Sequence, residues 1–185
     1  MLHSLEIIPK QTDRLKSLPT NLFGDIYVAF IPGDSTQNII ESCEFIIKCG
    51  YTPVPHVPAR NIKNEIELEN YLNGLCNVGV KKILSIGGSG KSPEGIFEST
   101  YEIFETGIIN KFNFEQINIA GHPEGNPNDI QSDLNLLKKL TWLTKNNLKS
   151  SIVTQWTFDI KKTNSWIKKI KSDIKPISET TEIHI

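Results

Sequence analysis

Polar side chains that could carry acid-base chemistry stand at the ends of several apolar stretches of this chain. Glu6 lies in the first stretch, His56 ends the third, and His122 follows the fifth. Gln155 lies in the sixth, and a glycine-rich segment, GGSGKS at residues 87–92, follows the fourth. In α/β proteins the carboxyl ends of parallel strands face an open crevice where ligands bind. A carboxylate, two imidazoles, an amide and a glycine loop around one cavity therefore predict an enzyme site.

The elements that must position these residues alternate between short apolar strands and longer amphipathic helices. The predicted strands are residues 4–8, 25–31, 52–56, 82–86, 116–121, 151–158 and 182–185. The predicted helices are residues 36–49, 64–77, 93–109, 130–147 and 164–172. The strand starts lie about 20 to 35 residues apart, which is the length of a strand with its crossover helix.

This order favours an α/β fold of the (β/α)8 TIM-barrel type. Seven strands are predicted, and a complete barrel needs eight strands and about 250 residues. We therefore expect a single barrel domain over residues 1–185 that is incomplete, with its carboxyl-terminal part missing.

The composition of the chain disfavours several classes of function. The chain has 20 Lys and Arg against 21 Asp and Glu, a net charge of −1, so a nucleic-acid partner is disfavoured. No apolar run approaches the roughly 20 residues that span a bilayer. We expect a soluble cytoplasmic protein without a membrane partner. The 3 cysteines form no C-x-x-C pair, so neither a disulfide framework nor a metal site is predicted.

Four motifs occur in the order known from the methylenetetrahydrofolate reductase family. EIIP at residues 6–9, PH at 55–56, AGHPE at 120–124 and IVTQWTFD at 152–159 correspond to E-[FV]-x-P, P-H, Y-P-E-x-H-P and I-T-Q-x-F-F-D. The chain is particularly similar to a divergent subgroup that reads P-H-x-P-A-R and A-G-H-P-E-G-N, here residues 55–60 and 120–126. The chain thus resembles this family of FAD-binding barrels over nearly its whole length.

The resemblance implies reduction of 5,10-methylenetetrahydrofolate to 5-methyltetrahydrofolate, or the reverse oxidation, with FAD carrying a hydride from NAD(P)H. Glu6 matches the general acid, a role that requires a raised pKa. Gln155 matches the amide that binds the folate pterin and contacts the nicotinamide. Ser89 stands where the family has an aspartate near both flavin and folate. The choice of NADH or NADPH and the oligomeric state, a homo-oligomer included, stay open.

The resemblance also implies a set of residues around the flavin. Glycines let the backbone approach a ring or pyrophosphate, and a lysine supplies charge for the phosphates. His122 replaces a tyrosine of the family, and Asn126 replaces a histidine. The set is Ala29, Phe30, His56, Gly87, Gly88, Ser89, His122, Asn126, Asp133 and Lys139.

Other interpretations remain beside this one. Each site residue has a structural alternative as a turn, cap or core group, and Trp156 and Trp166 are predicted to belong to the core. The chain could be a folate- or flavin-binding barrel without turnover. A nucleotide hydrolase is disfavoured, because the end of a phosphate-binding motif at residues 90–92 lacks its first glycine, which is Ser85 here.

Overall fold

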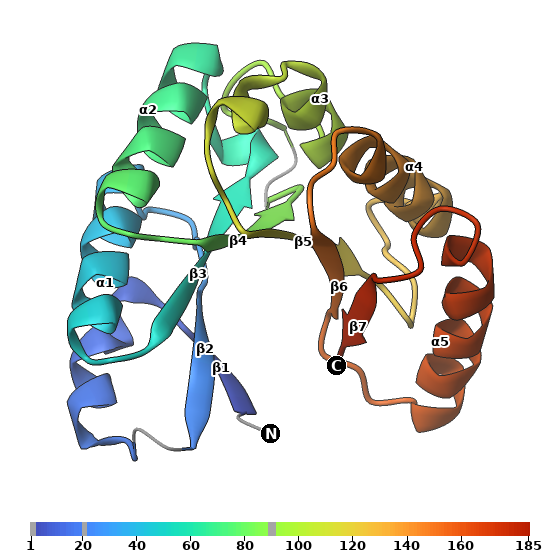
Figure 1. Ribbon diagram of the computed structural model, residues 1–185, viewed down its shortest axis with the longest axis horizontal. Helices are drawn as coiled ribbons and strands as arrows, with labels where there is room; N and C mark the ends of the chain where they lie inside the picture. Colours follow the sequence, from blue (N-terminus) through green and yellow to red (C-terminus); the bar gives the residue numbers. More distant parts are fainter. Residues whose placement is uncertain (1–2, 20–21, 89–91) are drawn as a thin grey trace. The chain divides into compact units, whose positions relative to one another are not determined.

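Strands and helices alternate along the whole chain, and the strands are parallel (Figure 1). The computed structural model describes residues 3–19, 22–88 and 92–185. It divides into two compact units, Met1–Glu115 (unit 1) and Gln116–Ile185 (unit 2). The predicted α/β class is confirmed. Closure of a complete barrel and the single domain stay predictions.

Unit 1 contains a parallel sheet with strand order β1-β2-β3-β4. Its strands are β1 (His3–Ile7), β2 (Phe23–Val28), β3 (Thr52–Pro58) and β4 (Lys82–Ile86). Its helices are α1 (Thr36–Lys48), α2 (Glu65–Asn77) and α3 (Thr100–Glu105), with short 3-10 helices at Pro9–Ser17, Ala59–Asn61 and Ile108–Lys111. In Figure 1, α1 and α2 lie side by side along one face of these strands.

Two local signals start the helices of unit 1 where the sequence predicts them. The Ser35 side chain accepts a hydrogen bond from the Asn38 backbone N–H and caps α1. Asn64 caps α2 in the same way through the Glu67 N–H. Such caps satisfy backbone donors that the first helical turn leaves free. The caps therefore fix the first residues of the two helices, Thr36 of α1 and Glu65 of α2.

Unit 2 repeats the pattern with a parallel sheet of order β5-β6-β7. Its elements are β5 (Gln116–Gly121), α4 (Ser132–Lys145), β6 (Ser150–Thr154), α5 (Ile160–Ile174) and β7 (Glu182–His184). Alternate residues of β5, such as Ile117 and Ile119, are buried together with Leu140 of α4 and Ile170 of α5. The other face of β5 presents Asn118 and Ala120.

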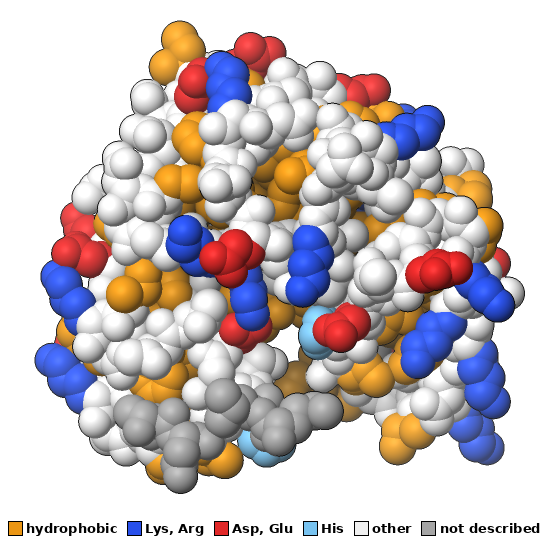
Figure 2. Space-filling view, in the orientation of Figure 1, with side chains coloured by type: hydrophobic (Ala, Val, Ile, Leu, Met, Phe, Trp, Pro, Cys, Tyr) orange, Lys and Arg blue, Asp and Glu red, His pale blue; other side chains and the backbone are white. Residues whose placement is uncertain are grey.

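Lysines dominate the exposed face of α5. Figure 2 shows basic side chains along the side of unit 2 that α5 forms, whereas acidic and basic side chains are interspersed over much of the same view. Among the described helices none is long and apolar enough to cross a membrane.

Three predicted elements have clearly wrong boundaries, and one element was not predicted. The strand predicted at 151–158 ends at Thr154, and the helix predicted at 164–172 covers Ile160–Ile174 because Asp159 caps it by accepting from the Lys162 N–H. The helix predicted at 93–109 shrinks to Thr100–Glu105, where Ser99 caps the start. The 3-10 helix Pro9–Ser17 was not predicted, since its short turns lack the 3.6-residue apolar spacing.

Candidate active site

Glu6 and His56 meet over the end of β2. Glu6 on β1 lies opposite Tyr27 on β2, and Val28 lies opposite Pro55 on β3. The register therefore puts the next residue, Ala29, beside His56 on the same face. Glu6 Oε2 lies 3.4 Å from His56 Nε2. Because Ala29 has only a methyl group, the two longer side chains can reach each other across the strand.

The two partners differ in exposure. The Glu6 side chain is 62 % exposed, whereas that of His56 is 10 % exposed. At 3.4 Å the two groups lie within ion-pair distance, but they do not form a hydrogen bond, and among the described residues the buried His56 Nε2 has no hydrogen-bond partner. The His56 carbonyl accepts a hydrogen bond of 2.8 Å from the Tyr71 hydroxyl, which fixes the backbone at this position.

The His56 imidazole, 3.4 Å away, lowers the pKa of the Glu6 carboxyl below its usual value, and partial burial opposes this only in part. In the chain alone the pKa of Glu6 is therefore lowered, whereas a general acid in a site closed by a flavin would need a raised pKa. With a lowered pKa, Glu6 is a carboxylate at neutral pH. The arrangement suits a base or a group that stabilises positive charge better than it suits a proton donor.

Tyr27 was missed by the sequence analysis. It lies beside Glu6 in the register and is 8 % exposed. Burial, with Asp25 and Glu6 nearby, raises the pKa of Tyr27 to about 12, so its hydroxyl keeps its proton. Further along the same face Lys82 Nζ lies 2.9 Å from an Asp25 carboxylate oxygen. Counting every second residue back from Ala29 would have placed Tyr27 on this face.

The remaining flavin candidates of unit 1 follow β2 and β4. Phe30 is half-buried after Ala29. Gly87 has open space where a side chain would be, and its carbonyl accepts from the Arg60 N–H at 2.9 Å. Gly88 has a φ of +90°, and a Cβ there would lie 2.7 Å from Asn61 Oδ1, so glycine is required. Ser89 lies outside the described residues.

In unit 2 the structure brings His122 and Asn126 together. Asn126 Nδ2 lies 3.4 Å from His122 Nε2, just after the end of β5. Burial, and next the Lys139 ammonium, lower the pKa of His122, so its imidazole is neutral at physiological pH. Burial also lowers the pKa of Lys139, and Asp129 opposes that shift. His122, Asn126 and Lys139 thus form one polar cluster.

The Asp133 carboxylate is hydrogen-bonded to two side chains of α5. It accepts a hydrogen bond of 2.7 Å from Trp166 Nε1 and one of 2.8 Å from Lys169 Nζ. These contacts join α4 to α5. A role for Asp133 at a flavin stays a prediction, although the structure gives its carboxylate a packing role.

Gln155 and the aromatic residues after it are exposed. The Gln155 N–H donates to the Gly121 carbonyl at 2.9 Å, which ties the segment after β6 to β5, while the side chain is exposed. Trp166 is buried as predicted, at 7 % exposure, but the core prediction for Trp156 was wrong, because it is 80 % exposed. Trp156 contacts Phe158 with ring centroids 6.2 Å apart.

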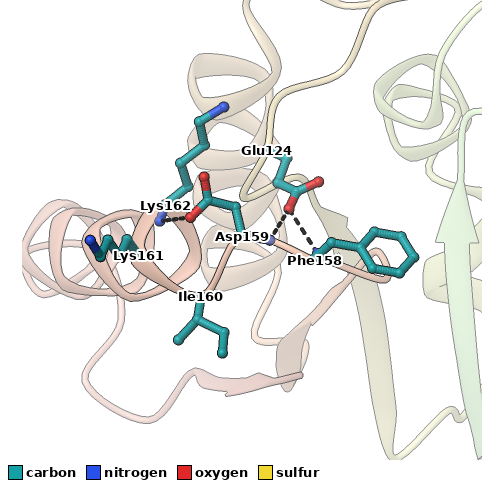
Figure 3. A pocket seen from close by; sticks show the side chains of 6 residues that line it. All are labelled: Glu124, Phe158, Asp159, Ile160, Lys161 and Lys162. Carbon is teal, nitrogen blue, oxygen red and sulfur yellow. Dashed lines mark hydrogen bonds between the residues drawn. The ribbon is translucent and has the colours of Figure 1, made fainter.

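Glu124 lines a shallow pocket at the start of α5 (Figure 3). Its Oε1 accepts hydrogen bonds from the backbone N–H of Phe158, at 2.8 Å, and of Asp159, at 2.5 Å. Figure 3 shows Phe158 pointing away from Lys161 and the helix. The carboxylate of the AGHPE motif therefore shapes the segment that carries Trp156 and Phe158. Among the described residues no three His, Cys, Asp or Glu side chains are grouped to hold a metal ion.

Comparison with known proteins shows a fold and no family. No protein-family model matches the chain. The crystal structure of citrate synthase SbnG matches 97 % of this chain and 76 % of its own length at 9 % identity, with a TM-score of 0.52. A β-N-acetylhexosaminidase structure matches 98 % of this chain and 54 % of its own length at 10 % identity, with a TM-score of 0.40. The chain is thus similar in fold to the citrate synthase structure.

Proposed function

We propose that this chain is an FAD-dependent reductase of the methylenetetrahydrofolate reductase type. It would interconvert 5,10-methylenetetrahydrofolate and 5-methyltetrahydrofolate with NAD(P)H as the partner of the flavin. The observation that carries the proposal is the Glu6–His56 contact at the ends of β1 and β3. It joins residues of the first two motifs of that family, which lie 50 residues apart in the sequence.

The described residues fit a flavin in part. FAD would supply hydride transfer. The open space beside Gly87 leaves room for a flat ring in unit 1. In unit 2 the cluster of His122, Asn126 and Lys139 offers hydrogen-bond donors for polar groups.

The chain's own residues would handle the proton and bind the pterin. An ionised Glu6 stabilises the cationic iminium form of the folate one-carbon unit, and it takes up the proton released when the folate ring closes during oxidation of methyl-folate. The exposed Gln155 amide can donate to and accept from a pterin edge. These roles favour the oxidative direction.

Spectroscopy of the purified chain tests the proposal. We expect FAD to bind, NAD(P)H to bleach it without oxygen, and methylene-folate to restore the yellow colour. In Glu6→Gln, NAD(P)H should still bleach the flavin, but folate turnover should be lost. Glu105→Gln, an exposed acid of α3, is the matched control and should behave as the wild type. A chain that binds no FAD, or a Glu6→Gln variant with full folate turnover, contradicts the proposal.

A second candidate is a flavin- or folate-binding protein without turnover. The lowered pKa of Glu6 favours it, because a reductase working toward methyl-folate needs a proton donor. This candidate predicts that FAD or folate binds but that NAD(P)H leaves the flavin yellow. The same bleaching experiment therefore separates the two candidates.

A further inference from the structure

Residues 155–159 join β6 to α5, and this 155–159 segment presents its largest side chains to solvent. Trp156 and Phe158 are 80 % and 84 % exposed, and their ring centroids lie 6.2 Å apart. The Gln155 side chain, between β6 and this aromatic pair, is exposed as well. Two exposed aromatic rings beside an amide suit a binding surface, because the rings bury much apolar area when a ligand covers them.

The backbone of the segment is nevertheless fixed at both ends. At its start the Gln155 N–H donates to the Gly121 carbonyl at 2.9 Å. At its end Glu124 Oε1 accepts hydrogen bonds from the N–H of Phe158, at 2.8 Å, and of Asp159, at 2.5 Å. Only two residues lie between these anchors. Loss of the second anchor would therefore leave the amide and the aromatic pair tied on one side alone.

The turn that carries Glu124 has a defined conformation of its own. The Gly125 N–H donates to the His122 carbonyl at 2.9 Å, and Gly125 has a φ of +87°, a conformation that favours glycine. Pro123, inside this turn, is buried. The Glu124 carboxylate reaches the amino end of α5, where the helix dipole stabilises negative charge (Figure 3). The carboxylate thus projects from an ordered turn onto the end of the segment.

Other side chains at this place have different partners. The Asp159 carboxylate accepts from the Lys162 N–H at 3.0 Å and caps α5. Lys161 and Lys162 line the same pocket, but among the described residues the hydrogen bonds of Glu124 run to backbone N–H groups (Figure 3). The end of the segment therefore depends on an acceptor at residue 124.

We infer that Glu124 is a positioning residue: its carboxylate holds the 155–159 segment so that the Gln155 amide and the two aromatic rings are presented to the substrate. The inference deepens the proposed function and rests on it for the identity of that substrate, a folate. Hydrogen bonds to a charged acceptor are stronger than those between neutral groups. Because these bonds exist before a ligand arrives, the segment loses less freedom on binding, and the affinity for substrate depends on Glu124.

The direct test measures amide hydrogen exchange by NMR in the whole chain without ligands. In the wild type we expect the Phe158 and Asp159 amides to be protected, and in Glu124→Ala we expect both to exchange about tenfold faster or more. Glu124→Gln keeps an acceptor oxygen and should show a smaller increase. The Ile170 amide within α5 should stay protected in each variant. Glu179→Ala, which removes an exposed acid between α5 and β7, is the matched control and should leave the rates unchanged.

Two results of this experiment overturn the inference. In the first, the Phe158 and Asp159 amides of the wild type exchange as fast as those of an unstructured peptide, which decides the matter even if Glu124→Ala does not fold. In the second, the two amides exchange at equal rates in the wild type and in folded Glu124→Ala.

A second measurement separates positioning from general stabilisation of unit 2. In Glu124→Ala the KM for methylene-folate should rise about tenfold, while FAD affinity and bleaching by NAD(P)H stay within about twofold of the wild type. Glu124→Gln should restore most of the folate affinity. An unchanged KM, or an equal loss of FAD and folate affinity, overturns the inference. A chain that binds no FAD contradicts the proposed function, but hydrogen exchange still decides whether Glu124 holds the segment.

Discussion

Small residues end strands in both units, and they make room for different partners. Above Ala29 at the end of β2, two polar side chains meet on the face that carries no helix. At Gly121, the end of β5, the missing side chain makes room for the Trp166 ring of α5 on the helix-covered face. The same feature therefore makes room for a polar pair in unit 1 and for core packing in unit 2. Side chains alternate between the two faces along a strand. The face on which the small residue lies therefore decides whether a polar pair or a core side chain fills the space beside it.

The largest expected effect is at Gly121. A Cβ there would lie 2.7 Å from Trp166 Cη2 and 2.8 Å from Ile152 Cγ2. We expect Gly121→Ala to lower the free energy of unfolding by about 2 kcal/mol, as overpacking does. Gly87→Ala is the matched control, since no heavy atom lies within 4 Å of its Cβ position. Urea unfolding checks both, and equal effects of the two substitutions would remove the contrast between the strand ends.

Much of the fold followed from the sequence, whereas the contacts of the site did not. The predicted strands at 82–86 and 116–121 match β4 and β5, because each is an apolar run that stops at glycine or begins after polar residues. The meeting of Glu6 and His56 depends on the register of three strands, which apolar spacing does not fix. The exposure of Trp156 depends on where β6 ends, and composition does not report that.

The next effect concerns the tryptophan that packs beneath Gly121. The Trp166 indole N–H donates to the Asp133 carboxylate at 2.7 Å. Trp166→Phe keeps the ring but loses this bond to a charged acceptor, so we expect a loss of about 1.5 kcal/mol. Trp156→Phe is the control, and its exposed position predicts a change within about 0.5 kcal/mol. Equal losses in the two variants would show that the Asp133 contact does not stabilise unit 2.

We expect Ala29→Leu to have a smaller effect on stability but a specific effect on the contact between Glu6 and His56. The larger side chain would fill the space above β2, separate Glu6 from His56, and cost about 1 kcal/mol through overpacking. The Glu6 pKa should return toward 4.5. Ala120→Leu is the matched control on the face of β5 that carries no helix, and it should leave the Glu6 pKa unchanged. NMR titration of the Glu6 carboxyl measures the difference between the two variants.

The smallest effect is the pH dependence that the pair gives to folding. The Glu6 pKa is lower in the folded chain than its usual 4.5, so the folded state binds this proton less readily than the unfolded state does. The contribution of Glu6 is therefore complete above about pH 4.5 and is lost as the pH falls through the lowered pKa. Because the side chain is 62 % exposed, solvent screens it and the change is small. Urea unfolding between pH 6 and 3 should show that the difference in free energy of unfolding between the wild type and Glu6→Gln becomes smaller toward low pH.

The same comparison in a His56→Gln background should show no such pH dependence. The four variants form a double-mutant cycle, which isolates the interaction between the two side chains. If the dependence persists without His56, the lowered pKa of Glu6 has a source other than the imidazole.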